Sequence, residues 1–596
     1  MSACDDGDDF SGAIAGNVLT HVSSGPVLLT CDDSLKTAFK PNANTTVIAV
    51  KEFKRGDPLV LSGAPTANTP TAASDVCMVK LNVGPGNVGP ADAPSTSPGI
   101  GIEVWLPSRA SWNRRIHNLG GGGWQGGASG SPTEIDGGGA SVAGVEGAVS
   151  STTDLGHSGG MLGSGVFAMN PNGSLNEKLL HDFVLRGGHE QAVKTRALAI
   201  AYYGKAPKHT YFEGSSGGGR HGLGMAQNFP KDYDGIIAGA PAINWTRFLT
   251  NMVYPWIVIQ NDLGGHPLTI EQLDLVSKAA ISACDVVGMQ HLGYVIDPPS
   301  CKYDPVKDPA VLCPSSGGAN QTPDCVTTVQ ATAFDKFWYG MTIDGSLVSP
   351  DIDNGWGNVT TNALPTGTHR WWGYTRGTSL DAKFLAAFGA NGVASPNGTY
   401  FIGPEMIALE LLNPGYADPS FVNQSGNGQS LWKTLSYTQL AHAYDQGQAL
   451  QPQFFGIDTN NPDLSAFIRR GGKMLTRQGL NDELVPPQGA LNYYSRVAAK
   501  MGSIEAVRKF YRLFLIPGMG HGNWNGTSNP STDIPMLASG QLYGLLTNWV
   551  ENGVAPDQAV LASKVTPGKN RLICAYPTKP TYMSGDPYVA NSWSCS

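Results

Sequence analysis

The sequence predicts an α/β fold, in which helices cover both faces of a mostly parallel sheet and one long insertion interrupts the pattern. Short apolar strand patterns alternate with helical periodicity at both ends of the chain. Residues 244–455 break this alternation, because they are rich in glycine, proline, asparagine and aromatic residues. A chain of 596 residues is also too long for one compact core. We therefore expect a discontinuous main domain, residues 1–243 with 456–596, and an inserted lid domain, residues 244–455.

Each expected element follows from its local pattern. Short apolar runs bounded by turn residues predict strands at residues 46–52, 100–106, 115–119, 210–213, 235–238, 473–476 and 511–516. Apolar residues at helical spacing predict helices at residues 175–186, 191–203, 218–228 and 540–551. The alternation of these strands and helices implies a sheet that is buried on both faces.

A serine flanked by glycines follows the strand pattern at residues 210–213. Ser216 lies between Gly214 and Gly218 in the spacing Gly-x-Ser-x-Gly. A strained strand-to-helix turn needs this spacing, because a side chain at either glycine would clash. Such a turn exposes the serine hydroxyl and directs the next backbone N–H groups toward an oxyanion. We interpret Ser216 as a nucleophile; in a chain with 76 glycines, the alternative is an ordinary turn.

Two later segments supply partners for Ser216 in the order serine, acid, histidine that α/β-hydrolases use. The apolar run at residues 473–476 leads into a loop with Asp482, and the run at 511–516 leads through a Gly/Pro turn to His521. Serine needs an imidazole to take its proton and a carboxylate to orient the imidazole. We therefore predict a catalytic triad on an α/β-hydrolase fold. The alternative is that Asp482 caps a helix and His521 lies in a surface loop.

The chain also resembles the tannase and feruloyl esterase family, which includes hydrolases of mono-(2-hydroxyethyl) terephthalate. The resemblance covers most of the chain and implies a secreted serine esterase that acts on esters of aromatic acids. It rests on these segments: Trp112-Asn113, Gly120 to Gly123, Asp154-Leu155-Gly156-His157, the serine turn through Arg220, Tyr233 to Pro241, Pro517-Gly518-Met519-Gly520-His521, and Trp549 to Asp557.

The expected oxyanion hole has two backbone donors. Gly217 follows the nucleophile and would supply the first N–H group. The resemblance points to Gly123, in the glycine run 120–123, for the second. The alternative for the glycine run is a flexible turn.

The chain departs from the family at the two catalytic loops. The family usually has a cysteine directly before the nucleophile and another directly after the histidine, joined in a disulfide, whereas this chain has Ser215 and Gly522. Closing a loop of about 300 residues is worth about 5 to 6 kcal/mol in the chain-entropy model, so packing must substitute for the bridge here. We predict that Ser215→Cys with Gly522→Cys would restore it.

By the same resemblance, eight of the nine cysteines form four disulfides: Cys31 with Cys77, Cys284 with Cys301, Cys313 with Cys325, and Cys574 with Cys595. Cys4 is left over. Sequence alone leaves the connectivity open, and the alternative is a reduced cytosolic protein with buried cysteines. Eight Asn-x-Ser/Thr sequons agree with a secreted glycoprotein, although many could arise by chance.

The family carries a calcium loop rich in aspartate between two lid cysteines. In this chain the corresponding segment, residues 284–297, keeps only Asp285 and Asp297 as carboxylates. Calcium prefers six to eight oxygen ligands, several of them anionic. We therefore expect no cofactor and no tight metal site, and one equivalent of calcium retained after dialysis would overturn this expectation.

Composition excludes several classes of partner. The net charge of −8 argues against nucleic acid and anionic membranes, and no apolar run is long enough to span a bilayer. Charged residues make up only 14% of the chain, which favours a loop-rich extracellular protein. The N-terminus lacks the pattern of a signal peptide, so we expect a mature chain with an added methionine. We expect a monomer or homodimer that binds a small aromatic ester.

Substrate choice is expected to depend on the lid. Trp371, Trp372, Tyr374 and Arg376 could stack a phenolic ring and pair with an anionic group. The alternative is that the tryptophans fill the core of the lid and that Arg376 is solvated. His157 is expected to be structural rather than a second base. Three functions stay open: an esterase for aromatic acids such as ferulate or gallate, a divergent hydrolase of a lactone, depside or terephthalate-type ester, and a catalytically silent phenolic-binding protein.

Overall fold

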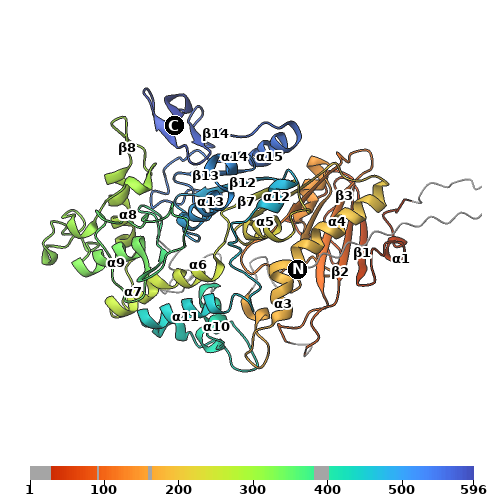
Figure 1. The fold of residues 1–596 in the computed structure, drawn as a ribbon, viewed down its shortest axis with the longest axis horizontal. Coiled ribbons are helices and arrows are strands. Elements are labelled where there is room, and N and C mark those ends of the chain that lie inside the picture. The colour runs from red at the N-terminus through yellow and green to blue at the C-terminus, as the bar shows by residue number, and fades with distance from the viewer. Residues whose placement is uncertain (1–27, 90–92, 159–163, 381–401) are drawn as a thin grey trace, which may run out of the picture.

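The computed structural model describes residues 28–89, 93–158, 164–380 and 402–596 (Figure 1). A parallel sheet of five strands lies in the middle of the molecule, in the spatial order β13-β12-β7-β6-β4. Its strands are β4 (Arg115–Leu119), β6 (His209–Ser215), β7 (Gly235–Gly239), β12 (Lys473–Gly479) and β13 (Tyr511–Ile516). All five were predicted from their apolar runs, and the α/β-hydrolase fold class is confirmed.

A second, antiparallel sheet continues from β4. Its order is β1-β2-β3-β5, with β1 at Thr45–Phe53, β2 at Val76–Val83, β3 at Ile100–Pro107 and β5 at Ser150–Thr153. Val149 joins the two sheets, because its carbonyl accepts from the His117 N–H at 2.8 Å and its N–H donates to the Arg115 carbonyl at 3.0 Å. The strands predicted at residues 46–52 and 100–106 thus lie in this antiparallel sheet, as β1 and β3, and not in the parallel one.

Helices cover both faces of the parallel sheet. Because alternate residues of a strand point to opposite faces, the central strands feed two cores. Phe212, Ile236 and Met474 pack with α5 (Gly217–Asn228), whereas Tyr211, Ile237 and Leu475 pack with α15 (Gln541–Asn552). The other helices of this part are α1 (Leu35–Ala38), α2 (Gly138–Ser141), α3 (Glu177–His181), α4 (Gly187–Tyr203), α12 (Ser465–Arg469), α13 (Pro487–Met501) and α14 (Ile504–Arg508).

The regular structure in the described parts of the insertion, residues 244–455, is mainly helical. Figure 1 shows it in green to cyan, at the opposite end of the molecule from the antiparallel sheet. Three of its helices begin with capping boxes at Thr269, Thr327 and Ser436. Its elements are α6 (Trp245–Met252), α7 (Tyr254–Asp262), α8 (Ile270–Cys284), α9 (Thr328–Tyr339), α10 (Ile402–Glu410), α11 (Tyr437–Ala449), and the strand pairs β8 (Val286–Val287) with β9 (Gln290–His291) and β10 (Gly340–Thr342) with β11 (His369–Trp372).

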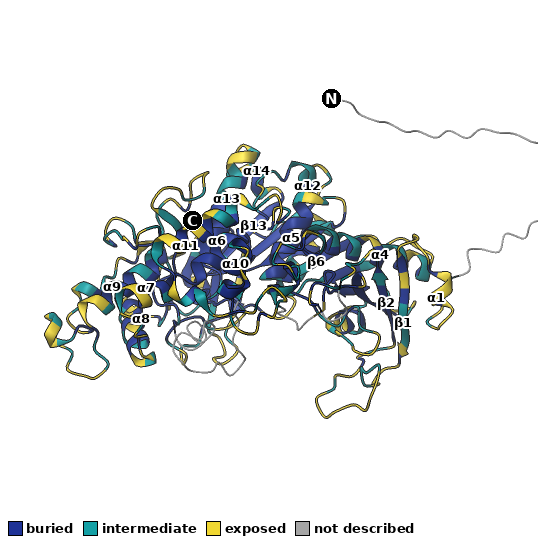
Figure 2. Cartoon of the chain, turned by 90° about the horizontal axis from the view of Figure 1, so that it is seen from below, coloured by how far each residue is buried: buried dark blue, intermediate teal, exposed yellow. Residues whose placement is uncertain are grey.

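The insertion shares one core with the sheet. Phe212 of β6 and Trp338 of α9 belong to the same cluster of buried side chains. Figure 2 shows α6 and α10 as largely buried helices, while α8 and α9 carry exposed surfaces. The division into a catalytic domain and a lid domain, with the boundaries given above, stays a prediction.

All four predicted disulfides are present. Cys31–Cys77 fastens the N-terminal segment to β2, and Cys284–Cys301 and Cys313–Cys325 lie in the insertion. Cys574–Cys595 joins β15 (Asn570–Cys574) to β17 (Trp593–Cys595), which pair with β14 (Gln558–Ala562) and β16 (Pro580–Tyr582), respectively. Cys4 lies outside the described residues.

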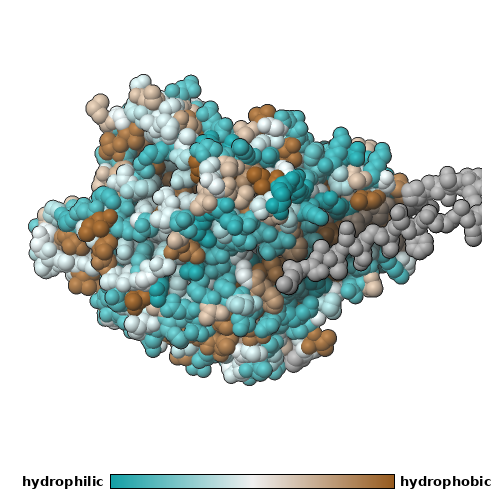
Figure 3. Space-filling view, viewed as in Figure 1, coloured by the Kyte–Doolittle hydropathy of each residue, from teal (hydrophilic) through white to brown (hydrophobic). Residues whose placement is uncertain are grey.

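The surface carries scattered hydrophobic side chains among hydrophilic ones, as the face in Figure 3 shows. In the described parts of the chain, no helix has the length and apolar character that crossing a membrane requires.

Candidate active site

The turn between β6 and α5 is a strained elbow. Ser216 has φ 59° and ψ −122°, a conformation that side chains rarely adopt. A Cβ at Gly214 would lie 2.5 Å from the Gly218 backbone, and a Cβ at Gly218 would lie 2.5 Å from the Gly121 carbonyl oxygen. Only glycine fits both positions, so the Gly-x-Ser-x-Gly spacing is a geometric requirement of this turn. Ser216 itself is partly exposed.

His521 and Asp482 lie side by side in the loops that follow β13 and β12. The imidazole Nδ1 of His521 is 3.0 Å from each carboxylate oxygen of Asp482. The carboxylate is fully buried and also accepts hydrogen bonds from the backbone of Leu484 and Val485 and from the amide of Gln478. A proton held on Nδ1 by Asp482 leaves Nε2 free to accept another proton.

A second carboxylate supports the histidine loop. Glu483 accepts from the backbone N–H of His521 at 3.0 Å and from the indole N–H of Trp524 at 2.9 Å. Burial lowers the pKa of His521, but Asp482 and then Glu483 outweigh burial and raise it above its usual value. Burial and the neighbouring Asp482 raise the pKa of Glu483. The pocket around the imidazole therefore favours its cationic form.

The three predicted triad residues follow strands of one parallel sheet. Ser216 follows β6, Asp482 follows β12 and His521 follows β13, and parallel strands end at the same edge. Arg477 of β12 connects their loops directly, because its guanidinium donates to the Ser215 hydroxyl and to the His521 carbonyl, each at 3.0 Å. The structure thus places the Ser216 elbow and the His521–Asp482 pair at the same edge of the sheet, and a contact between Ser216 and His521 stays a prediction.

The glycine run after β4 lies against the elbow. The N–H of Gly218 donates to the Gly121 carbonyl at 2.7 Å, and a Cβ at Gly217 would lie 2.7 Å from the Gly123 carbonyl oxygen. Gly123 has φ +54°. Gln125 fixes the run, because its side-chain oxygen accepts from the Gly121 N–H at 2.6 Å. The backbones of both predicted oxyanion donors, Gly123 and Gly217, are therefore adjacent, and Gly217 is the first residue of a helix, where N–H groups lack helical acceptors.

The four residues predicted to bind substrate lie in the core of the insertion. Trp371, Trp372, Tyr374 and Arg376 are each at most 4% exposed. Arg376 donates to the carbonyls of Tyr303 and Asn354 and pairs with Asp335, so its guanidinium is held by the protein. This placement favours the alternative that the tryptophans fill the core of the lid. Arg376, which that alternative expected to be solvated, is buried. A direct role in substrate binding stays untested.

His157 has the structural role that we expected. It stacks on Phe167 with ring centroids 3.7 Å apart, and its Nε2 lies 2.6 Å from the Trp124 carbonyl. Burial lowers its pKa to about 4. A buried imidazole of this kind orders the segment around Trp124.

The two carboxylates of the segment 284–297 bind other groups of the protein. Asp285 contacts His291 Nδ1 at 2.6 Å and the Gly293 N–H at 2.8 Å, and Asp297 pairs with Lys579 at 2.7 Å. Two carboxylates with these partners do not provide the oxygen-rich shell that calcium requires. The expectation of no tight calcium site stays a prediction.

Gly522, where the family has a cysteine, faces a tryptophan. A Cβ at Gly522 would lie 1.8 Å from the ring of Trp524, which is 43% exposed. A side chain at residue 522 therefore requires the indole ring to swing outward.

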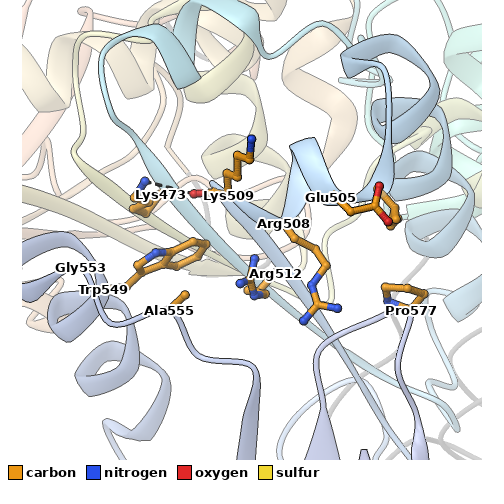
Figure 4. A pocket seen from close by; sticks show the side chains of 10 residues that line it. Lys473, Glu505, Arg508, Lys509, Arg512, Trp549, Gly553, Ala555 and Pro577 are labelled. Atoms are coloured by element: carbon orange, nitrogen blue, oxygen red, sulfur yellow. Dashed lines mark hydrogen bonds between the residues drawn. The ribbon is translucent and has the colours of Figure 1, made fainter. Parts of the chain in front are cut away.

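A hollow of about 560 Å³ lies at the opposite, amino edge of β12 and β13 (Figure 4). Lys473, Arg508, Lys509, Arg512 and Trp549 line it, and none of the triad residues does. Because the triad residues do not line this hollow, we do not assign the ester chemistry to it.

Several contacts of the site were absent from the sequence-based prediction: those of Arg477, Gln125, Gln478 and Glu483. The arginine had a visible signal, because a charge within an apolar strand run requires a specific partner. Gln125 and Glu483 had no comparable signal, since polar residues in loops are common. Gln478 lies in β12, two residues beyond the apolar run from which the strand was predicted.

A strained serine elbow, a carboxylate-bound histidine and an adjoining glycine loop at the carboxyl edge of a parallel sheet define a hydrolase of the α/β-hydrolase class. A model of the family described as tannase and feruloyl esterase matches residues 86–596. The chain therefore belongs to the tannase and feruloyl esterase family and is a carboxylic ester hydrolase.

Relatives and solved structures agree with this assignment. The chain is 30% identical over 536 residues to a probable feruloyl esterase of Arthroderma benhamiae, covering 89% of this chain and 88% of the relative. It is 29% identical to the mono(2-hydroxyethyl) terephthalate hydrolase of Piscinibacter sakaiensis, covering 83% and 81%. The crystal structure of feruloyl esterase B from Aspergillus oryzae superposes with a TM-score of 0.69 at 24% identity, covering 95% of this chain and 99% of that one, and thus supports the fold.

Proposed function

We propose that this protein is a secreted serine esterase that hydrolyses esters of aromatic, phenolic acids such as ferulate or gallate. The observation that carries the proposal is the His521–Asp482 pair, which Arg477 links to the elbow of Ser216. Membership of the family supports the aromatic acyl group, and four disulfides support an oxidising, extracellular compartment.

The proposed reaction begins with acylation. The Ser216 hydroxyl attacks the ester carbonyl, His521 Nε2 takes the hydroxyl proton, and Asp482 stabilises the resulting imidazolium. The tetrahedral oxyanion accepts hydrogen bonds from the backbone N–H groups of Gly217 and Gly123. When the intermediate collapses, the C–O bond to the alcohol breaks and His521 returns the proton to the departing alkoxide.

Deacylation repeats the same steps with water. His521 takes a proton from a water molecule, whose oxygen attacks the acyl carbonyl of the ester on Ser216. The second tetrahedral intermediate collapses, the Ser216 oxygen regains a proton from His521, and the aromatic acid leaves. In related chemistry one oxyanion donor contributes about 10²- to 10³-fold in kcat, so the glycine loop is expected to supply a major part of the rate.

A second candidate is a terephthalate-type monoester. The relative from Piscinibacter sakaiensis bears that activity in its name and is nearly as similar to this chain as the probable feruloyl esterase. Both candidates share an aromatic acyl group and the same mechanism. A terephthalate monoester carries a carboxylate opposite the scissile ester, where gallate and ferulate carry a phenolic hydroxyl, and ferulate also has a propenoyl spacer between the ring and the ester.

The test compares wild type with Ser216→Ala on methyl ferulate, methyl gallate, mono-(2-hydroxyethyl) terephthalate, an aromatic depside, an aryl lactone and an aliphatic ester of matched size. We expect turnover of aromatic esters, reduced at least about 10⁴-fold in the variant. Full activity in Ser216→Ala would refute the nucleophile. An inactive wild type that a fluorophosphonate probe also fails to label would favour a silent phenolic-binding protein.

A further inference from the structure

Arg477 reaches across a neighbouring strand. It lies on β12, opposite Gly239 of β7, which in turn lies opposite Ser215 of β6. A Cβ at Gly239 would be 3.1 Å from Arg477 Nε and 3.2 Å from the Ser215 hydroxyl oxygen. The side chain of Arg477 therefore passes over the glycine to reach β6, and the absence of a side chain on β7 leaves room for it.

The two branches of the guanidinium contact two different catalytic loops. Nη2 donates to the hydroxyl of Ser215, the residue directly before the nucleophile, at 3.0 Å. Nη1 donates to the backbone carbonyl of His521 at 3.0 Å. A guanidinium is planar and rigid, so two bonds from one head fix the separation of their acceptors.

We propose that Arg477 is a positioning residue that clamps the nucleophile elbow to the histidine loop and so sets the geometry between Ser216 and His521. This inference rests on the proposed function, because the clamp matters only where Ser216 and His521 react together. A misplacement of about 1 Å between reacting groups can cost about 10²-fold in rate.

The charge of Arg477 gives the clamp a second effect. Asp482 and Glu483 raise the pKa of His521, whereas Arg477 lowers it. Burial lowers the pKa of Arg477 itself, and the charges of Asp482 and Glu213 counteract burial. A general base works only when it is unprotonated. By lowering the pKa of His521, Arg477 extends to lower pH the range over which His521 can act as a base. Removal of the charge would therefore shift the acid limb of the rate profile to higher pH.

The test uses a fluorophosphonate probe, which modifies the serine nucleophile without requiring the natural substrate. The second-order labelling rate is measured between pH 5 and 9 for wild type, Arg477→Gln and Arg477→Lys. We expect Arg477→Gln to lower the plateau rate about 10- to 100-fold and to move the acid limb to higher pH. Arg477→Lys should also lose rate, because an ammonium lacks the fork, but it should keep the acid limb near that of wild type.

Two further variants separate positioning from folding. Arg512→Gln, on the adjacent strand β13, removes another buried arginine far from the elbow, and we expect its labelling rate to stay within about twofold of wild type. Ser215→Ala removes one acceptor of the Arg477 guanidinium and leaves the arginine in place, so it should lower the labelling rate by about 3- to 10-fold. This variant keeps the proposal testable if Arg477→Gln fails to fold. Thermal unfolding of each variant shows whether the assayed protein is folded.

The outcomes distinguish the clamp from the proposed function. Wild type labelled at Ser216, with Arg477→Gln and Ser215→Ala labelled at the wild-type rate and with an unchanged pH profile, would overturn the clamp alone. A folded wild type that the probe does not label, or labels elsewhere than Ser216, would overturn the proposed function and the clamp with it. Slow labelling of Arg477→Gln and Ser215→Ala, with normal labelling of Arg512→Gln, would establish the clamp.

Discussion

The two edges of the parallel sheet use arginine in different ways. At the carboxyl edge, Arg477 donates to two neutral oxygen atoms on separate loops, and each bond is 3.0 Å long. At the amino edge, four cationic side chains line a hollow beside Trp549 (Figure 4). Two of them, Arg508 and Arg512, share the carboxylate of Asp557. The first arrangement fixes positions, whereas the second balances charge.

This difference between the edges supports the proposal that the chemistry takes place at the carboxyl edge. Loops at the carboxyl edge are joined by bonds with defined geometry, and glycines allow the backbones of the elbow and the glycine run to touch. At the amino edge, the cations are partly neutralised by a carboxylate that is 60% exposed, so solvent screens their interaction. Changes at the first edge should therefore alter rates strongly, and changes at the second should alter stability weakly.

After the loss of Ser216 itself, the largest expected effect at the carboxyl edge is that of Asp482→Asn. The amide would no longer stabilise the imidazolium and would favour the wrong tautomer of His521, so we expect kcat to fall about 10⁴-fold. The measurement is kcat on any ester that wild type hydrolyses, with thermal unfolding as the test of folding.

Glu483→Gln is the matched control for this prediction. Glu483 contacts the backbone N–H of His521 but not its ring, so we expect a loss of at most about tenfold. If Glu483→Gln cost as much as Asp482→Asn, the assignment of the acid would be wrong.

A covalent link between the catalytic loops should have the next largest effect. Ser215→Cys with Gly522→Cys can form a disulfide only if the ring of Trp524 swings away from residue 522. We therefore expect the bridge to form more completely when Trp524→Ala is added. The bridge should stabilise the oxidised protein by about 2 to 4 kcal/mol, less than the chain-entropy value, because Arg477 loses the Ser215 hydroxyl.

Thiol titration of the denatured, unreduced variants measures this link. Two free thiols at residues 215 and 522 in both the double and the triple variant would show that the loops cannot be bridged. A double variant that bridges as completely as the triple variant would contradict the expected displacement of Trp524.

The sequence predicted the carboxyl edge better than the rest of the fold. The strands at residues 115–119 and 511–516 were predicted with their observed bounds, and each of them is followed by a turn that contains glycine. Strand β2 was not predicted, because Lys80 and Asn82 interrupt its apolar pattern. Lys80 is nevertheless fully buried, since it pairs at 2.9 Å with Glu103 on the adjacent strand.

Contacts between residues that are distant along the chain also explain what the sequence analysis missed at the site. The partners of Arg477 are 262 and 44 residues away along the chain, so no local pattern announces them. Ser216, Asp482 and His521 could be predicted because each has a local motif and the three occur in a known order. The aromatic cluster of Trp371 and Trp372 has neither, so its residue types predicted both a substrate-binding role and the buried core position that the structure shows.

Between the two edges, His117 of β4 should make stability depend on pH. Its ring stacks on Tyr543 and lies 3.1 Å from Glu146 and 3.3 Å from Glu213. Burial lowers the pKa of His117, but the two carboxylates outweigh burial and raise it above the usual value. A raised pKa in the folded state stabilises the protein below pH 6.5, and this stabilisation is lost as the pH rises through the folded-state pKa.

Urea unfolding from pH 5.5 to 9 measures this dependence. In wild type, the free energy of unfolding should fall as the pH rises. In His117→Gln this fall should be smaller, by about 1.4 kcal/mol for each unit by which folding raises the pKa of His117. The part that remains belongs to other histidines with a raised pKa, including His189 and His521. An identical pH slope in wild type and variant would show that His117 is not charged in the folded protein.

The smallest expected effect belongs to the amino edge, where Asp557→Asn removes the carboxylate shared by Arg508 and Arg512. Because this carboxylate is 60% exposed, we expect a loss of only about 0.5 to 1 kcal/mol, larger at low ionic strength and smaller at 1 M salt. Urea unfolding at two salt concentrations measures the change, and the fluorophosphonate labelling rate should stay that of wild type. A loss of several kcal/mol, or a slower labelling rate, would show that the amino edge also holds the catalytic loops in place and that the contrast between the two edges is wrong.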